Sequence, residues 1–239
     1  REVWNRSKQT YGYYRMWKYF REKLKKQVNI KKIRRIMRKY GMTSVIRRRR
    51  AYSYYKQSAY KYQNLLNRQF RQEHPNTFWV TDITYVPTKK GFVYLCAIMD
   101  LCGRMVLSWR VGDDMTASLV TDTVRDAVTK EMVTAGLSLH SDQGSQYTSK
   151  EYFDLTLLYH ISPSMSSPGC PYDNAIMENF FGILKSECLN RVEFADRADV
   201  EAAVSEYMQF YNFERINMQY GLTPNEIRSK AVYIQDILQ

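Results

Sequence analysis

The stretch FWVTDITYV at residues 78–86 decides the fold. Its β-branched and aromatic residues alternate around Asp82, which predicts a strand with a carboxylate inside it. Two more strand-like stretches follow, FVYLCAIMD at 92–100 and RMVLSWRVGD at 104–113. The breaks between them are short, so we expect hairpins and a three-stranded antiparallel meander.

Helical and strand-like patterns alternate after the meander. In chain order we expect a helix, a strand, a helix, a strand and two helices, at 116–130, 137–142, 149–159, 161–165, about 174–189 and about 196–213. This order predicts an α/β protein with a mixed five-stranded sheet and flanking helices, which is the order of the ribonuclease-H-like fold. We assign residues 75–190 to this catalytic core and 191–239 to a C-terminal helical extension of it.

The residues before the meander have a different pattern. Residues 11–26 place apolar side chains at helical spacing, and Asn29 is placed to cap a second amphipathic helix that Gly41 ends. Two short helices with a tight connection resemble a helix-turn-helix, although any small helical hairpin would show the same spacing. We therefore expect a small all-α, helix-turn-helix-like DNA-binding domain at 1–50 and a basic, tyrosine-rich linker at 51–74.

Positive charge is concentrated in the first third of the chain. Residues 1–72 hold 23 lysines and arginines against two acids, Glu2 and Glu22, whereas the rest of the chain holds 13 basic and 22 acidic residues. A basic segment joined to an acidic one is typical of a nucleic-acid-binding arm attached to another activity, and a solvated basic face is the alternative.

The candidate DNA contacts lie in this basic segment. Arginine and lysine neutralise phosphates, and tyrosine rings can stack on bases. The alternative is that the tyrosines pack on the neighbouring domain. The residues that we expect to touch DNA here are Arg34, Arg35, Arg38, Arg47, Arg48, Arg49, Arg50, Tyr54, Tyr55 and Lys56.

Three carboxylates occupy positions where the expected elements would converge. Asp82 lies inside a strand, Asp142 follows a short strand, and Glu178 lies about one turn into a helix. A buried carboxylate is costly unless it is paired or bound to a cation. Three carboxylates close together would offer the oxygen ligands that Mg²⁺ or Mn²⁺ prefers. Two such ions would activate the attacking oxygen of a phosphoryl transfer and stabilise the leaving oxygen. A single aspartate in a strand is more often structural, so this prediction depends on the whole set.

Lys185 lies seven residues after Glu178, which is two helical turns, so both side chains should point the same way. Gly182 leaves that face of the helix without bulk. Lys185 is therefore a candidate DNA contact, and an ordinary surface lysine is the alternative.

Taken in order, the segments carry a specific resemblance. WVTDITYV, GFVYLCAIMDLCGR, LHSDQGSQYTS, SMSSPGCPYDNAIMENFFGILKSE and FYNFERIN…GLTPNEI resemble the integrase-type catalytic core of insertion-sequence-three family transposases, with 35 residues between Asp142 and Glu178. YGYYR and VNIKKIRRIMRKYGM resemble the helix-turn-helix segment of that family. The resemblance covers roughly residues 11–230, and the combination is far more specific than any one fragment.

The resemblance implies a DDE transposase with Asp82, Asp142 and Glu178 as its metal-binding triad and Lys185 as a DNA contact near the transferred end. It implies a homodimer that acts on the two terminal inverted repeats of double-stranded DNA. One end would be cut and joined beside the other, which gives a DNA circle before insertion, a copy-out–paste-in route. Asn217 stands where the YN-x-x-R-x-H motif of the family usually has His, which leaves the role of that motif open.

Two other classes of protein were weighed. A catalytically inactive, sequence-specific DNA-binding regulator on the same scaffold should have lost a carboxylate, and all three are present. A retroviral-type integrase should carry a His/Cys zinc module, and the four cysteines and three histidines here show no such spacing.

The cellular setting follows from the same residues. The chain begins with Arg1, so we expect an upstream segment, such as the first-reading-frame product of the family, to act with it. No apolar run approaches the roughly 18 residues of a membrane span. We expect a cytoplasmic, nucleoid-associated protein that has no membrane partner and that uses two Mg²⁺ ions, for which Mn²⁺ substitutes.

Overall fold

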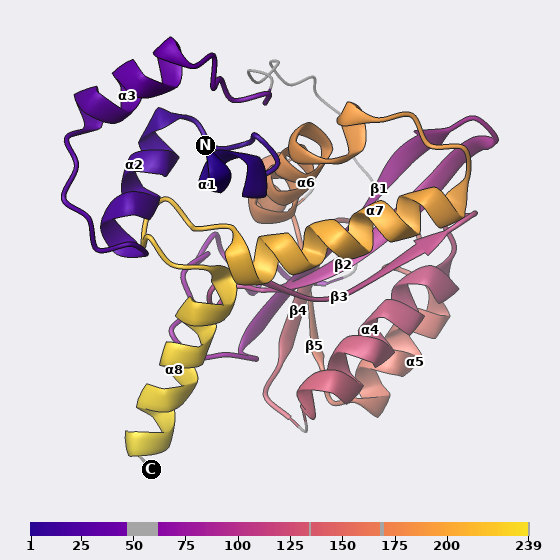
Figure 1. The fold of residues 1–239 in the computed structure, drawn as a ribbon. Coiled ribbons are helices and arrows are strands. Elements are labelled where there is room, and N and C mark those ends of the chain that lie inside the picture. Colours follow the sequence, from indigo (N-terminus) through magenta and orange to yellow (C-terminus); the bar gives the residue numbers. More distant parts are fainter. Residues whose placement is uncertain (47–61, 134, 168–169, 239) are drawn as a thin grey trace.

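The structure, a computed structural model, describes residues 1–46, 62–133, 135–167 and 170–238. A five-stranded sheet forms its centre (Figure 1). Seven of the expected DNA contacts lie outside the described residues, namely Arg47, Arg48, Arg49, Arg50, Tyr54, Tyr55 and Lys56.

β1 (Phe78–Thr88) is the middle strand of the sheet. β2 (Gly91–Asp100) and β3 (Met105–Gly112) continue from it on one side as antiparallel neighbours, as the short breaks between them predict. β4 (Ser138–Ser141) and β5 (Ser162–Met165) lie parallel to it on the other side, so the order is β3-β2-β1-β4-β5. The expected mixed sheet of a ribonuclease-H-like fold is confirmed.

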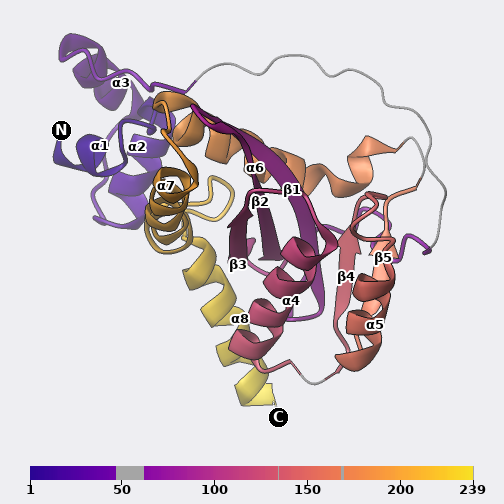
Figure 2. The ribbon, with the colours of Figure 1, turned by 90° about the vertical axis from the view of Figure 1, so that its right-hand side faces the viewer.

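Helices cover both faces of the sheet (Figures 1 and 2). α4 (Ala117–Glu131) and α5 (Lys150–Leu158) lie on one face. α6 (Ala175–Glu187) and α7 (Arg197–Gln209) lie on the other. All four helices were expected from the sequence, with ends that differ by one to four residues.

Strand alternation explains the two cores. Because successive side chains of a strand point to opposite faces, neighbouring residues of β1 enter different cores. Trp79 packs with Val124 of α4, whereas Val80 belongs to the core that contains Phe180 and Leu184 of α6. The apolar residues of α6 thus fix this helix against the strand that carries Asp82.

Two helices were not expected, α1 (Glu2–Arg6) and α8 (Pro224–Leu238). The helix expected to reach residue 213 ends at Gln209 and continues as a short π-helical turn, η3 (Phe210–Glu214). Two short 3₁₀ helices flank α6, namely η1 (Pro171–Asn174) and η2 (Leu189–Arg191).

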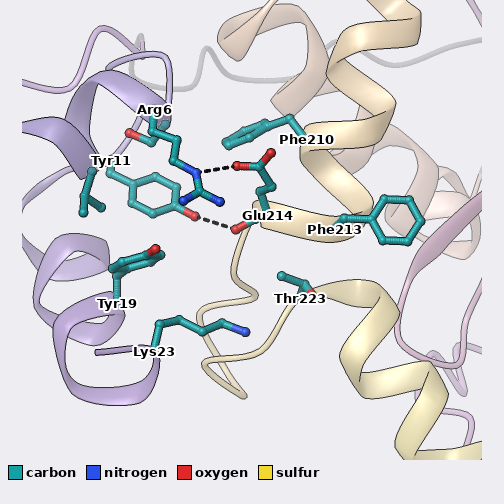
Figure 3. Close-up of a pocket in the computed structure, with 10 residues that line it drawn as sticks. Arg6, Tyr11, Tyr19, Lys23, Phe210, Phe213, Glu214 and Thr223 are labelled. Carbon is teal, nitrogen blue, oxygen red and sulfur yellow. Dashed lines mark hydrogen bonds and ion pairs between the residues drawn. The ribbon is translucent and has the colours of Figure 1, made fainter. Parts of the chain in front are cut away.

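The basic segment forms the expected pair of helices, α2 (Tyr13–Glu22) and α3 (Ile30–Lys39). The predicted cap is present, because Asn29 Oδ1 accepts a hydrogen bond of 2.8 Å from the Lys31 N–H. α1 and α2 pack against the C-terminal part of the chain, and a cavity of about 170 Å³ lies between the two parts. Figure 3 shows residues of both parts that line it. The Arg6–Glu214 ion pair and the hydrogen bond from the Tyr11 hydroxyl to the Glu214 carbonyl border this cavity.

Part of the basic charge is used inside the protein. Four ion pairs join the first 23 residues to acids between 187 and 226: Arg6–Glu214, Lys8–Glu206, Arg15–Glu187 and Lys23–Glu226. In contrast, the lysines and arginines of α3 make no ion pair within the described residues, and Arg34, Arg35 and Arg38 are exposed. The exposed face of α3 is therefore a cationic surface that is not used by internal ion pairs of the described residues.

No helix in the described part of the chain has the length and apolar character needed to cross a membrane.

Candidate active site

Asp82 lies at the middle of β1, where two neighbouring elements approach it. Asp142 comes directly after β4, the parallel neighbour of β1, and Glu178 lies in the first turn of α6, which packs on β1. Burial, and then the negative charge of Asp142, raise the pKa of the half-buried Asp82 to about 8. Glu178 raises this pKa further, whereas Lys185 lowers it. The structure thus brings three other predicted site residues, Asp142, Glu178 and Lys185, within electrostatic reach of Asp82.

Local hydrogen bonds orient the two aspartates. Asp82 Oδ1 accepts from the Ile83 N–H at 2.8 Å, and Asp142 Oδ1 accepts from the Gly144 N–H at 2.9 Å. A Cβ atom at residue 144 would lie 3.0 Å from Asp142 Oδ1 and 2.9 Å from Gln146 Oε1, so a larger residue here would displace both side-chain oxygens from their present positions. Asp142 itself is exposed, and partial desolvation of its carboxyl group raises its pKa.

Two polar residues that the sequence did not single out fix the start of α6. The buried Asp173 accepts hydrogen bonds from Asn64 Nδ2 at 2.9 Å, Arg68 Nε at 2.8 Å and the Ser167 N–H at 3.0 Å. Burial alone would raise the pKa of Asp173, but the Arg68 and Ser167 hydrogen bonds hold it below its usual range.

Asn174, the next residue, reaches β1. Its Nδ2 donates to the Thr81 carbonyl, beside Asp82, at 3.4 Å. The only sequence signal for Asp173 and Asn174 was their position, as two polar residues directly before the apolar first residues of a helix. We interpret both as positioning residues for the helix that carries Glu178.

Lys185 lies on the side of α6 that faces Asp82. Burial lowers the pKa of the half-buried ammonium group, and the Asp82 charge opposes this shift. The Lys185 Nζ also lies 4.5 Å from the centroid of the Tyr85 ring. Gly182 is exposed, and a Cβ there would meet no atom within 4 Å, so this part of α6 is open to a large ligand.

The donors of this site suit a divalent cation by their chemistry. In the described ranges, no three His, Cys, Asp or Glu side chains are already arranged to hold one metal ion. However, a half-buried carboxylate beside two others carries an electrostatic cost that a hard cation would relieve, and oxygen ligands are those that Mg²⁺ prefers. The three carboxylates therefore fit a magnesium ion as a donor set.

Comparison with known proteins gives the same picture. Integrase core domain profiles match residues 72–171 and 178–232, and an HTH-like domain profile matches 1–50. Transposase InsF of insertion sequence IS3A from Escherichia coli (strain K12) is 32% identical over 234 residues, which cover 95% of this chain and 80% of InsF. The chain belongs to the insertion-sequence-three family of transposases.

Other relatives of this transposase agree. Transposase InsK of IS150 from E. coli (strain K12) is 34% identical over 231 residues, covering 96% of this chain and 81% of InsK. The IS904 transposase of Lactococcus lactis subsp. lactis (strain IL1403) is 38% identical over 177 residues, covering 69% of this chain and 70% of that protein. The resemblance read from the sequence motifs is therefore confirmed.

Solved structures support the fold of the transposase. A chain of the simian T-cell lymphotropic virus intasome with the PP2A regulatory subunit B56 gamma matches with a TM-score of 0.55 at 16% identity, covering 84% of this chain and 67% of that one. The HTLV-2 integrase catalytic core domain in complex with magnesium matches with a TM-score of 0.53 at 20% identity, covering 66% and 99%. At these identities the likeness shows the fold alone.

The C-terminal motif, whose role the sequence left open, has a structural role here. The Asn217 side chain accepts a hydrogen bond from the Gln219 N–H at 2.8 Å, and its backbone bonds to Gly221 and Leu222 close the same turn. Asn217 thus serves as a turn residue. Arg215 of the same motif forms a buried ion pair with Glu187, at the end of α6.

Proposed function

We propose that this transposase binds the terminal inverted repeats of its element, hydrolyses a phosphodiester at the 3′ end and transfers that end to target DNA. The approach of Asp142, Glu178 and Lys185 to Asp82 is the observation that carries the proposal. Asp82, Asp142 and Glu178 would hold two Mg²⁺ ions, with Mn²⁺ as a substitute. When bound, such ions supply positive charge to the attacking and leaving oxygens of an in-line displacement.

The chain's own residues would prepare this chemistry. Near neutral pH the Asp82 carboxyl group holds a proton, which it must release when it becomes a ligand. Lys185, half-buried beside Asp82, would contact the phosphate backbone of the transferred end. Asp173 and Asn174 would keep Glu178 in register with β1 through the contacts at the start of α6.

The larger pathway belongs to the same proposal. Each chain offers one carboxylate site, whereas an element has two ends, so a homodimer would engage both. Joining one end beside the other would give a DNA circle before insertion, a copy-out–paste-in route in the cytoplasm at the nucleoid, with help from a first-reading-frame segment. Recovery of circle junctions from cells that express the active transposase with its element would test the route, and simple excision products alone would contradict it.

A DNA-binding regulator on an inactive scaffold is the alternative function. No observation favours it, because the chain retains all three carboxylates, and Asp142 and Glu178 both act on Asp82. An assay of Mg²⁺-dependent nicking on a labelled inverted-repeat end separates the two functions. End binding without any nicking, in the presence of the upstream segment, would support the regulator.

The raised pKa of Asp82 predicts how stability should depend on pH without metal. The folded state binds this proton more tightly than the unfolded state, so the stability contributed by protonated Asp82 is full below about pH 4 and is lost as pH rises toward about 8. Asp82→Asn should therefore raise the free energy of unfolding at pH 8 by on the order of 1–2 kcal/mol, a modest value because solvent screens the half-buried group. The gain should vanish near pH 4, as urea titrations at both pH values can measure.

Added Mg²⁺ provides the matched control for that measurement. It should raise the melting temperature of the wild-type protein, since the ion replaces the proton at Asp82, and leave that of Asp82→Asn nearly unchanged. If Mg²⁺ stabilises the wild type and Asp82→Asn equally, the cation binds at a site that does not include Asp82.

The exposed arginines of α3 predict the salt dependence of end binding. Each phosphate contact contributes about 0.9 to the slope of log affinity against log salt. Replacing Arg34, Arg35 and Arg38 with Gln should therefore weaken binding to an inverted-repeat duplex and lower that slope by about 2 to 3. Fluorescence anisotropy at several salt concentrations measures both effects.

A control that removes two other positive charges is available nearby. Arg6→Gln and Lys8→Gln remove cations that already pair with Glu214 and Glu206, so the salt slope should change little. A loss of slope in these variants equal to that of the α3 variant would mean that general charge, and not α3, determines binding.

A further inference from the structure

Two aromatic rings stand exposed beside the carboxylate site. Tyr85 on β1 and Phe92 on β2 are 58% and 57% exposed, and their centroids lie 5.5 Å apart with an interplanar angle of 88°. In the register of the hairpin Tyr85 faces Tyr94, and Phe92 faces Pro87, so the two rings meet diagonally across the strands. Single exposed apolar residues are ordinary, but two large rings in contact form an organised surface.

A cation connects this surface to the active site. The Nζ of Lys185 lies over the Tyr85 ring at 4.5 Å from its centroid, which is within the range of a cation–π contact. Lys185 is the cation on α6 that acts on Asp82, so this side chain connects the Tyr85 ring to the carboxylate site. The aromatic pair therefore borders the place where the scissile phosphate would lie.

The turn of the hairpin adds further positive charge. Lys89 is exposed and makes no ion pair within the described ranges, whereas Lys90 pairs with Asp196. A bridge between Thr88 and Phe194 holds this turn beside the segment before α7 (Figure 1). Exposed rings with Lys185 over one of them and Lys89 in the adjoining turn match the chemistry of single-stranded DNA sites, where bases stack on rings and cations neutralise the backbone.

From this arrangement we propose that Tyr85 and Phe92 form a stacking site for an unpaired nucleobase of the element's end, next to the phosphate that Lys185 contacts. A base inside a duplex has both faces covered by its neighbours, so the site selects an end whose last base pairs are open. Opening the end would let the backbone reach the carboxylates. The inference rests on the proposed function for the identity of the substrate and adds how the end is held.

The test uses DNA binding by full-length protein that carries Asp82→Asn, so that catalysis is not needed. Two inverted-repeat duplexes are compared, one fully paired and one with mismatches in its last base pairs, each with 2-aminopurine near the end as a stacking reporter. Phe92→Leu is the main variant, because Phe92 contacts Tyr85, whereas Tyr85 is the ring that lies under Lys185. Tyr85→Leu and Tyr85→Phe complete the set.

We expect Phe92→Leu and Tyr85→Leu to lose about tenfold in affinity for the mismatched end, as removal of one base–aromatic stack typically costs. The loss for the paired end should be smaller, and the 2-aminopurine signal should change on binding to the parent but not to these variants. Tyr85→Phe keeps the ring and should behave like the parent. Phe153→Leu on α5, a residue 44% exposed, controls for loss of an exposed ring elsewhere.

Two outcomes would overturn the inference. Equal affinities of parent and variants for the mismatched end would show that no base stacks there. A shift in the oligomeric state of the variants on size-exclusion chromatography, with end binding unchanged, would make the rings an interface between protein copies. Either result leaves the proposed metal chemistry standing, since that is judged separately by strand cleavage with wild-type Asp82.

Discussion

Asp82→Asn is expected to reduce strand cleavage and joining at an inverted-repeat end by at least about a thousandfold. In the proposed function Asp82 is an anionic ligand of the metal ions, and metal stabilisation of a displacement supplies several kcal/mol, each 1.36 kcal/mol being tenfold in rate. Asp142→Asn and Glu178→Gln should have effects of the same order. The measurement is single-turnover cleavage of a labelled end in Mg²⁺, with the upstream segment of the family present.

Folding and DNA binding separate this result from a trivial loss of structure. Without metal, Asp82→Asn should be at least as stable as the wild type at pH 8, since the raised pKa of Asp82 reflects an unfavourable carboxylate. End binding should remain, because the exposed arginines lie on α3, outside the carboxylate site. A matched control is Asp126→Asn on α4, an exposed carboxylate paired with Arg110, which should keep full activity. Cleavage that survives in Asp82→Asn, or that disappears in Asp126→Asn, would contradict the assignment.

The sheet could be predicted from the sequence because its signals are local. Alternation around Asp82 and the short breaks at residues 89–91 and 101–103 determine a meander without knowledge of any distant contact. The same holds for the caps: Asn29, Thr116 and Ser149 each accept a backbone N–H at a helix start.

One missed helix had a readable signal. α8 begins with a capping box, in which the Thr223 N–H donates to Glu226 Oε2 at 2.8 Å and the Glu226 N–H donates to Thr223 Oγ1 at 3.2 Å. The T-x-x-E spacing at 223–226 was sufficient to predict a helix there.

The sequence could not predict which basic side chains form ion pairs inside the protein and which stay exposed. Arg15 and Arg34 both stand on short amphipathic basic helices, yet Arg15 is paired with the buried Glu187 and Arg34 is exposed. The difference arises only when α2 packs on the C-terminal part of the chain, hundreds of bonds away. For the same reason the exposed ring of Tyr85 was not anticipated, because strand alternation does not say where a covering helix ends.

The second large effect concerns stability. Arg215→Met is expected to lower the free energy of unfolding by about 3–5 kcal/mol, because it leaves the carboxylate of Glu187 buried without its main partner. In the wild type, Arg215 holds Glu187 with two hydrogen bonds of 2.8 Å each, and the Tyr207 hydroxyl donates a third of 2.9 Å. Glu187 is 1% exposed. Urea denaturation followed by circular dichroism measures the change.

An exposed pair on α7 gives the control for that measurement. Arg197→Met removes the ion pairs to Glu201 and Asp113, and it should cost no more than about 1 kcal/mol because exposed pairs are worth little. Similar losses in the two variants would show that the buried position of Arg215 has no special weight.

The pH dependence of stability shows whether Arg215→Met acts by leaving the Glu187 carboxylate unpaired or by a loss of packing. Burial would raise the pKa of Glu187, but Arg215 first, and then Arg15 and Tyr207, bring it below its usual range. In the wild type this contribution is present above about pH 4.5 and is lost as pH falls below it. In Arg215→Met most of the opposing charge is gone, so the pKa of Glu187 should rise and the variant should gain from protonation. The stability gap between the two proteins should therefore narrow as pH falls from 7 toward 4.

A double variant completes the argument. Arg215→Met combined with Glu187→Leu removes both charges, so no anion is left buried without its counterion, and replacing a buried pair by apolar groups is often close to neutral. We expect this double variant to recover more than half of the loss seen in Arg215→Met, measured as a coupling free energy in a double-mutant cycle. If the stability loss of the double variant equals the sum of the losses of the two single variants, Arg215 acts through packing against Tyr211 and not through Glu187. Because Glu187 is the last residue of α6 and Glu178 lies in its first turn, this pair connects the C-terminal motif to the position of the helix that carries Glu178.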